Sequence, residues 1–321
     1  MRILTWLAVL LAALYGSYWF VASKAARNGA EIAIAEAGAR GIDVQHQGLD
    51  LTGFPSRFDL TLTEPRVSGA GWRWQAPFAQ VFALSYSPWK LISALPNTQH
   101  LDLAGQGVEI ASTRMQASLF LRPETALSLD RFDAVVEGAS LRGDAGWALG
   151  FASANASLIA QEGGAQAAFR MLEIVPDQRV TVALNGALPA VVERFDLLAD
   201  LGLSQPLGLR APPAELTRVT LREAHLIWGP LKLTASGELV PDAQGRAEGR
   251  VDLRVEGWQQ GLAAAEAAGA VPEQFRTMLR SMLENLAAQS DETGVLKLPL
   301  VMAQGQMRLG PLPLGPTPRL R

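Results

Sequence analysis

Alternating apolar and polar positions run through most of the chain after Gly41 and indicate a body built of β-strands. Phe58, Leu60 and Leu62 alternate with polar residues, a pattern typical of a strand with one buried face. The same pattern recurs at 81–86, 108–111, 117–122, 126–135, 180–184, 216–228, 231–239, 249–256, 295–301 and 306–309. Short turns join these segments. The expected fold class is therefore mainly β (α+β), a long, curved antiparallel sheet with a few amphipathic helices packed on it.

The clearest turn separates the alternating runs at 232–240 and 246–256. It reads Pro241-Asp242-Ala243-Gln244-Gly245, and glycine supplies the positive φ that such a hairpin needs. Antiparallel pairing is the expected result. Strand–helix–strand alternation is missing from the body, which argues against a doubly wound parallel sheet.

Two segments show helical rather than strand spacing. The segment from Ala190 to Leu201 follows Pro189 and places its apolar residues on one face, and so does the segment from about Pro272 to Ala288. The apolar residues of the second segment are Phe275, Met278, Leu279, Met282 and Leu286. We expect this stripe to cap the sheet. A face that lies at a membrane interface or binds a partner is the alternative.

An uncharged, mostly apolar stretch from Ile3 to Ser23 precedes the strands. A helix of about 20 apolar residues spans a bilayer core, so we expect 1–23 to be a single-pass transmembrane signal anchor. A cleavable signal peptide, cut at Ser23-Lys24-Ala25, is the alternative. The apolar run is longer than a signal-peptide core, and its far end carries aromatic residues such as Trp19, which are typical of a membrane interface. Both features favour an uncleaved anchor.

The rest of the chain is expected to form a stalk and one body outside the cytoplasm. Residues 24–41 are rich in alanine and predict a helical stalk that ends at Gly41. Residues 42–321 are expected to form a β-rich extracytoplasmic domain, with 205–213 as the candidate sub-boundary.

Composition limits the function more than it defines it. Hydrophobic residues make up 49% of the chain and charged residues 18%, with a formal net charge of −3, so the body is ordered and nucleic acid is not an expected partner. Cysteine is absent, which excludes thiol catalysis and cysteine-bound metals. His46, His100 and His225 lack metal-ligand spacing, and the chain has neither a G-x-S-x-G elbow nor a Walker-type glycine loop. We therefore expect no catalytic residue, no cofactor and no enzymatic activity.

A cluster of aromatic residues supplies the one candidate binding surface. Its members are Trp72, Trp74, Phe78, Phe82, Tyr86 and Trp89. Their mostly even spacing predicts that several share one sheet face. The commoner interpretation of such a set is the core of the sheet, and the functional one is an apolar groove able to hold acyl chains.

Several of these segments carry a family resemblance. Gly53-Phe54-Pro55-Ser56-Arg57-Phe58-Asp59-Leu60, Trp74-Gln75-Ala76-Pro77, Leu84-Ser85-Tyr86-Ser87-Pro88 and the closing segment 305–315 resemble the bacterial family called domain of unknown function 2125. The resemblance extends over nearly the whole chain and implies a Gram-negative envelope protein, here placed in the inner membrane with its body in the periplasm. It implies no reaction. The hairpin from Gly237 to Gly257 also resembles AsmA-like envelope proteins, which are implicated in lipid transport.

Two function classes follow from these patterns. The first is a non-enzymatic, membrane-anchored envelope protein whose sheet binds or shields lipid or another apolar ligand. The second is an anchored scaffold or assembly factor that binds another envelope protein through a sheet edge or the face from Phe275 to Leu286. A carrier would leave one apolar sheet face open, whereas a scaffold would cover that face with its own helices.

Overall fold

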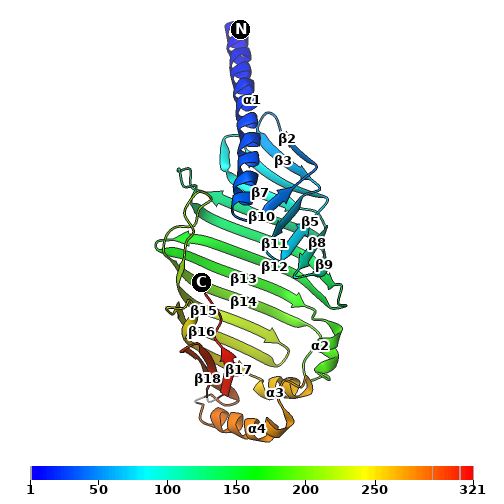
Figure 1. Cartoon of the computed structure of the whole chain (residues 1–321), viewed down its shortest axis with the longest axis vertical. Coiled ribbons are helices and arrows are strands. Elements are labelled where there is room, and N and C mark those ends of the chain that lie inside the picture. The colour runs from blue at the N-terminus through cyan, green and yellow to red at the C-terminus, as the bar shows by residue number, and fades with distance from the viewer. Residues whose placement is uncertain (1, 291, 311, 321) are drawn as a thin grey trace.

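Antiparallel strands form nearly all of the body in the computed structural model, which describes residues 2–290, 292–310 and 312–320. Figure 1 shows the strands following one another along the long axis of the molecule. Helix α1 (Arg2–Ala39) projects from one end, and α3 (Trp258–Ala267) and α4 (Glu273–Ala288) lie at the other. The expected mainly β class is confirmed.

The strands near the amino terminus are short, those from β11 to β17 are longer, and the last two are short again. Those near the amino terminus are β1 (Asp43–Gln45), β2 (Gly48–Thr52), β3 (Arg57–Thr63), β4 (Arg66–Gly69), β5 (Trp72–Gln75), β6 (Phe78–Leu84), β7 (Ser87–Leu95), β8 (Thr98–Leu103), β9 (Gln106–Ala111) and β10 (Arg114–Leu121). The later ones are β11 (Leu129–Gly143), β12 (Ala148–Gln161), β13 (Gly164–Ile174), β14 (Val192–Leu203), β15 (Leu216–Trp228), β16 (Leu231–Pro241), β17 (Ala247–Glu256), β18 (Val295–Ala303), β19 (Gln306–Leu309) and β20 (Leu312–Pro316). A short helix, α2 (Gln178–Ala183), follows β13.

The sheet forks at β11. Strands β11 to β20 pair in sequence order, each with the next. The first part of β11 pairs with β10 and leads through β7, β6 and β3 to β2. Its last residues pair instead with β9, which leads through β8, β5 and β4 to β1. Two branches of the sheet therefore share one strand.

A line of sharp bends separates the two branches. Pro65, Pro77 and Pro96 each lie where one strand ends and its continuation begins, because proline cannot donate to the ladder. Gly138 makes the corresponding bend within β11, with a φ of 55°. Hydrogen bonds such as that from the Glu64 N–H to the Pro77 carbonyl, 2.9 Å, hold the bend together.

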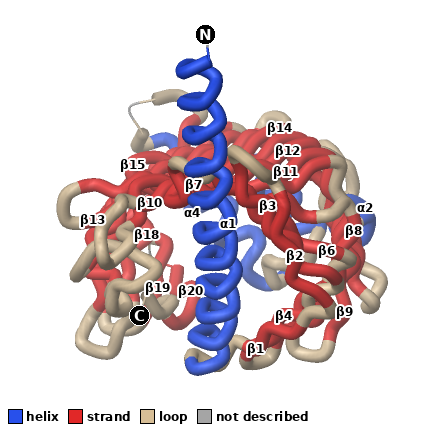
Figure 2. Tube along the Cα trace, turned by 90° about the horizontal axis from the view of Figure 1, so that it is seen from above, coloured by secondary structure: helices blue, strands red, loops and turns tan. Residues whose placement is uncertain are grey.

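Seen end-on in Figure 2, the strands curve into an arch. A cluster of buried side chains closes one end, where Trp258 and Leu262 of α3 and Leu283 of α4 pack on Leu296 and Leu298 of β18. The helix predicted from Pro272 to Ala288 is confirmed as α4. Its apolar stripe caps the sheet in part, since Phe275 and Met278 remain exposed.

Two local predictions were wrong. The segment from Ala190 to Leu201 forms strand β14 rather than a helix, because ladders to β13 and β15 hold it on both sides. The segment 180–184 lies mostly in α2 rather than in a strand. Asp177 caps that helix by accepting a hydrogen bond from the Arg179 N–H.

Residues 24–39, where a helical stalk was predicted, lie in one helix with the residues before them. Helix α1 runs to Ala39, and Gly41 follows with a φ of 83°. Within the described residues, no helix combines the length and apolar character needed to cross a bilayer. The membrane span expected from Ile3 to Ser23 therefore has no support from the structure. From Tyr15 onward, side chains of α1 pack against the body instead.

Candidate functional site

One face of the sheet is apolar from end to end. A row of directly paired residues crosses thirteen strands on this face and includes no polar side chain: Phe58, Ala83, Leu91, Leu119, Phe132, Leu158, Ala167, Ala199, Leu221, Gly237, Val251, Leu300 and Leu309. Paired residues point to the same side of a sheet. At about 4.8 Å per strand, the row is roughly 58 Å long. We call this side of the sheet the apolar face.

A second paired row reinforces the apolar face. It contains Val136, Ala154, Met171, Phe195, Leu226, Leu233, Val255 and Leu296. Phe169 and Phe195 on the neighbouring strands β13 and β14 bring their rings to 6.0 Å between centroids. The apolar residues that alternate along each strand therefore lie side by side across the strands and form the apolar face.

The ends of the apolar face are covered and its middle is not. Helices α3 and α4 pack over Leu296 and Leu298, and α1 packs over the opposite end at β2 and β3. Between them Phe132, Leu158 and Phe169 are only partly buried. The middle of the apolar face is therefore accessible to solvent.

An apolar cavity of about 510 Å³ lies where α1 covers the apolar face. Small residues of α1, namely Ala26, Gly29 and Ala30, form one wall. The facing wall comes from Leu51, Phe58, Leu60, Val81, Ala83, Leu91 and Leu121. Trp89, Pro88, Pro123, Leu127, Leu209 and Arg210 complete the lining. A volume of about 300–1,000 Å³ is typical of sites for small molecules, so the cavity has room for one.

An aromatic cluster holds α1 in place above the cavity. Trp19 is 6% exposed, and its Nε1–H donates to the Arg57 carbonyl at 2.9 Å. Its ring lies 5.3 Å from that of Phe54 and 6.1 Å from that of Phe58, between centroids. The aromatic residues expected at a membrane interface therefore include one that is buried in the body.

Two tyrosines of α1 add polar contacts to a single serine. The Tyr18 hydroxyl donates to the Ser85 carbonyl at 2.8 Å, and the Tyr15 hydroxyl lies 3.1 Å from Ser85 Oγ. Ser85 is fully buried, and its Oγ also donates to the Ser56 carbonyl at 3.1 Å. The turn of α1 from Tyr15 to Trp19 thus joins the helix to the loop before β3 and the turn after β6.

The six candidate aromatic residues divide between different surroundings. Trp89 lines the cavity. Phe78 and Phe82 project from the other side of β6, because Val81 and Ala83 face the cavity. The Phe82 ring lies 5.8 Å from the Arg57 guanidinium.

The remaining three aromatic residues also lie away from the cavity. Trp74 lies on β5, in the branch of the sheet that runs from β9 to β1. Its indole N–H donates to Gln99 Oε1 at 2.9 Å. Trp72 lies on the same short strand, β5. Tyr86 is 65% exposed in the turn after β6. The structure thus brings one of the six residues, Trp89, to the cavity.

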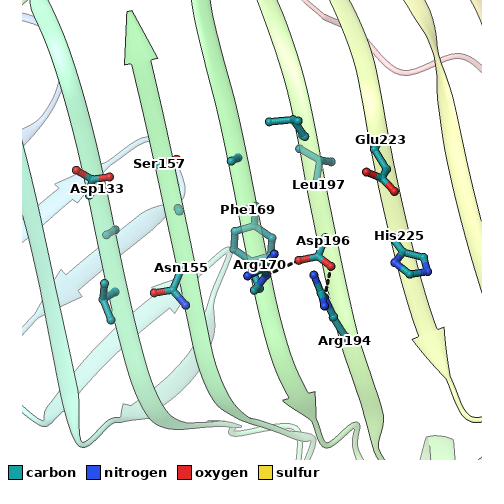
Figure 3. A pocket seen from close by; sticks show the side chains of 15 residues that line it. Asp133, Asn155, Ser157, Phe169, Arg170, Arg194, Asp196, Leu197, Glu223 and His225 are labelled. Atoms are coloured by element: carbon teal, nitrogen blue, oxygen red, sulfur yellow. Dashed lines mark hydrogen bonds and ion pairs between the residues drawn. The ribbon is translucent and has the colours of Figure 1, made fainter.

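The opposite face of the sheet is polar and rich in ion pairs. Figure 3 shows Asp196 of β14 between Arg170 of β13 and Arg194, in an open depression of about 470 Å³ that Glu223 and His225 also line. Partial burial opposes ionisation of Asp196, but hydrogen bonds from the two arginines outweigh it and hold the pKa of Asp196 below its ordinary value. Asp196 is therefore ionised at neutral pH and balances the arginines.

The described residues contain no cluster of three or more histidine or carboxylate side chains placed to hold a metal ion. The ion pairs of the polar face instead link neighbouring strands, as Arg222 on β15 does with Asp200 on β14. Such pairs fit the outer, solvated side of the sheet.

Comparison with known families identifies the class of protein. A family model described as "Uncharacterized protein conserved in bacteria (DUF2125)" matches residues 19–318. The chain therefore belongs to this family, and the predicted resemblance is confirmed. Comparison with curated proteins and with solved structures gave no match, so the likeness to AsmA-like proteins stays a prediction. The match begins at Trp19, the residue that docks α1 on the body.

Proposed function

We propose that the protein is a non-enzymatic envelope protein that binds lipid or another apolar ligand in the cavity beneath α1 and along the adjoining apolar face. The observation that carries the proposal is the cavity of about 510 Å³, whose described lining residues are apolar except for Arg210. It opens on the same face as the partly exposed Phe132 and Leu158. An apolar face that is open over its middle is what distinguishes a carrier from a scaffold.

Membrane attachment belongs to the same proposal. The first turns of α1 extend away from the body, and Ile3, Leu4 and Trp6 are 86%, 74% and 74% exposed. Large apolar side chains so exposed favour a lipid environment. We place the protein at the inner membrane, attached through these turns, with the body in the periplasm. Alkaline extraction of membranes tests attachment, and recovery in the soluble fraction would contradict it.

The test of ligand binding uses a glycine pair within α1. Gly29 lines the cavity, Gly38 does not, and an added Cβ at either position meets nothing within 4 Å. Either Gly→Leu substitution should stabilise the helix, since leucine is the better helix former by about 0.8 kcal/mol. Only Gly29→Leu places a side chain in the cavity.

Lipids that copurify after gentle detergent extraction are then quantified by mass spectrometry. We expect wild type and Gly38→Leu to retain the same lipid, and Gly29→Leu to retain several-fold less. Equal retention by the two variants would show that the cavity is not the site. If wild type retains no lipid, the proposal fails.

A scaffold is the second candidate, and one observation favours it. Phe275 and Met278, which belong to the apolar stripe of α4, are 46% and 57% exposed. This pair provides an apolar contact for another envelope protein. Loss of a crosslinked partner in Phe275→Ser, with lipid retention unchanged, would support the scaffold role.

A further inference from the structure

The cavity beneath α1 has a charged residue in its lining. Of the described residues around it, fifteen are apolar or glycine and the sixteenth is Arg210. Arg210 is exposed, so its guanidinium is hydrated where the apolar lining meets solvent. An apolar cavity with a cationic side chain at its edge matches an amphiphile, which has an apolar chain and a polar headgroup.

Backbone hydrogen bonds fix the position of Arg210. The segment that carries it follows β14 and pairs with the distant turn before β11. The Leu129 N–H donates to the Leu207 carbonyl at 2.7 Å, and the Arg210 N–H donates to the Ala126 carbonyl at 3.1 Å. A Cβ on the intervening Gly208 would lie 2.9 Å from the Ala126 carbonyl oxygen, so the approach needs glycine. These hydrogen bonds hold the segment 205–213 beside the cavity.

Arg210 also differs in its ion pairing from arginines of the polar face. Nearby arginines on the polar face have acidic partners, since Arg122 pairs with Asp130 at 3.4 Å and Arg131 pairs with Asp133 at 2.6 Å. Within the described part of the chain, no carboxylate forms an ion pair with Arg210. Its guanidinium is therefore available to an anion.

We infer that the cavity binds an anionic amphiphile, with a single apolar chain against Leu60, Val81 and Leu91 and a carboxylate or phosphate headgroup paired with Arg210. This inference rests on the proposed ligand-binding function and adds the charge of the ligand. A guanidinium is weakly hydrated and offers paired donors that match carboxylate and phosphate oxygens. The apolar chain supplies affinity, and the arginine selects the headgroup.

Binding of three probes with the same chain tests the inference. Decanoate, decyl phosphate and 1-decanol are titrated below their aggregation limits into the full-length protein in detergent, stripped of copurified lipid. We expect the two anions to bind about fivefold more tightly than decanol at low salt, as a favourable exposed ion pair permits. The preference should shrink at about 1 M NaCl, where the screening length falls to about 3 Å.

Two arginine variants assign the preference to a residue. Arg210→Gln should weaken both anions to the level of decanol and leave decanol unchanged. Arg142→Gln removes the same charge from an exposed position of β11 outside the cavity and should behave as wild type. Equal binding of all three probes to wild type, or an anion preference that survives in Arg210→Gln, would overturn the inference. Binding of no probe would instead overturn the proposed function itself.

Discussion

Docking of α1 through Trp19 gives the sharpest prediction about stability. The side chain is 6% exposed, contacts the Phe54 and Phe58 rings, and donates to the Arg57 carbonyl. A buried aromatic side chain removes roughly 200 Å² from water, which is worth about 5 kcal/mol at 25 cal/mol per Å². Measured truncations of buried tryptophan cost about 3–5 kcal/mol. We therefore expect Trp19→Ala to weaken docking of α1 by about 4 kcal/mol.

Trp6 provides the matched control, because it lies on the same helix and is 74% exposed. Trp6→Ala should change docking by no more than about 0.5 kcal/mol. Hydrogen exchange of the α1 amides and tryptic cleavage after Lys24 and Arg27 report undocking directly, in detergent so that both variants stay soluble. Equal protection of α1 in the two variants would refute the assignment of Trp19 as the main contact between helix and body.

Two further predictions concern the sheet and α2. Hydrogen bonds from the Arg179 side chain and from the backbone N–H groups of Arg179 and Ala148 lower the pKa of Asp177 to about 2. The ionised Asp177 therefore stabilises the fold above its unfolded pKa of about 4, and this stabilisation is lost as the pH falls through about 2. The difference in urea midpoint between wild type and Asp177→Asn should accordingly narrow as the pH falls from about 4 to about 2. At Gly138, φ is 55° and an added Cβ would lie 2.8 Å from Thr113 Oγ1. By urea unfolding, Gly138→Ala should cost roughly 1–2 kcal/mol more than Gly146→Ala, whose Cβ meets nothing within 4 Å.

Period-two alternation predicted most of the sheet because each strand keeps one apolar face. Strands β15 and β19 begin and end at the predicted residues, and the turn at Gly245 joins β16 to β17 as expected. The pattern failed where apolar residues occupy both faces of a strand. In β14, Leu198 lies on the opposite face from Leu197 and Ala199, while the register with β13 stays regular. The apolar residues Phe195, Leu198 and Leu201 therefore fall at helical spacing.

The candidate site was less accessible to prediction because it depends on long-range pairing. Alternation shows that a strand has an apolar face, but it does not reveal which strand lies under α1. Trp89 was found because aromatic residues stand out in the sequence. Arg210 was missed because its segment shows no periodicity, and its proximity to the cavity depends on the pairing of Gly208 with Ser128. Position in the fold, rather than residue type, makes that arginine a candidate.

The sizes of the two proposed interactions imply a division of roles. Each methylene moved from water into the apolar cavity contributes about 0.8 kcal/mol, so a few carbons exceed the contribution of an exposed ion pair, which is about 1 kcal/mol at most. The chain would therefore determine affinity, and Arg210 would determine orientation and headgroup preference. Lengthening the chain should then tighten binding equally in wild type and Arg210→Gln. The headgroup preference should stay constant until the cavity of about 510 Å³ is full, where any further chain extends onto the open part of the apolar face.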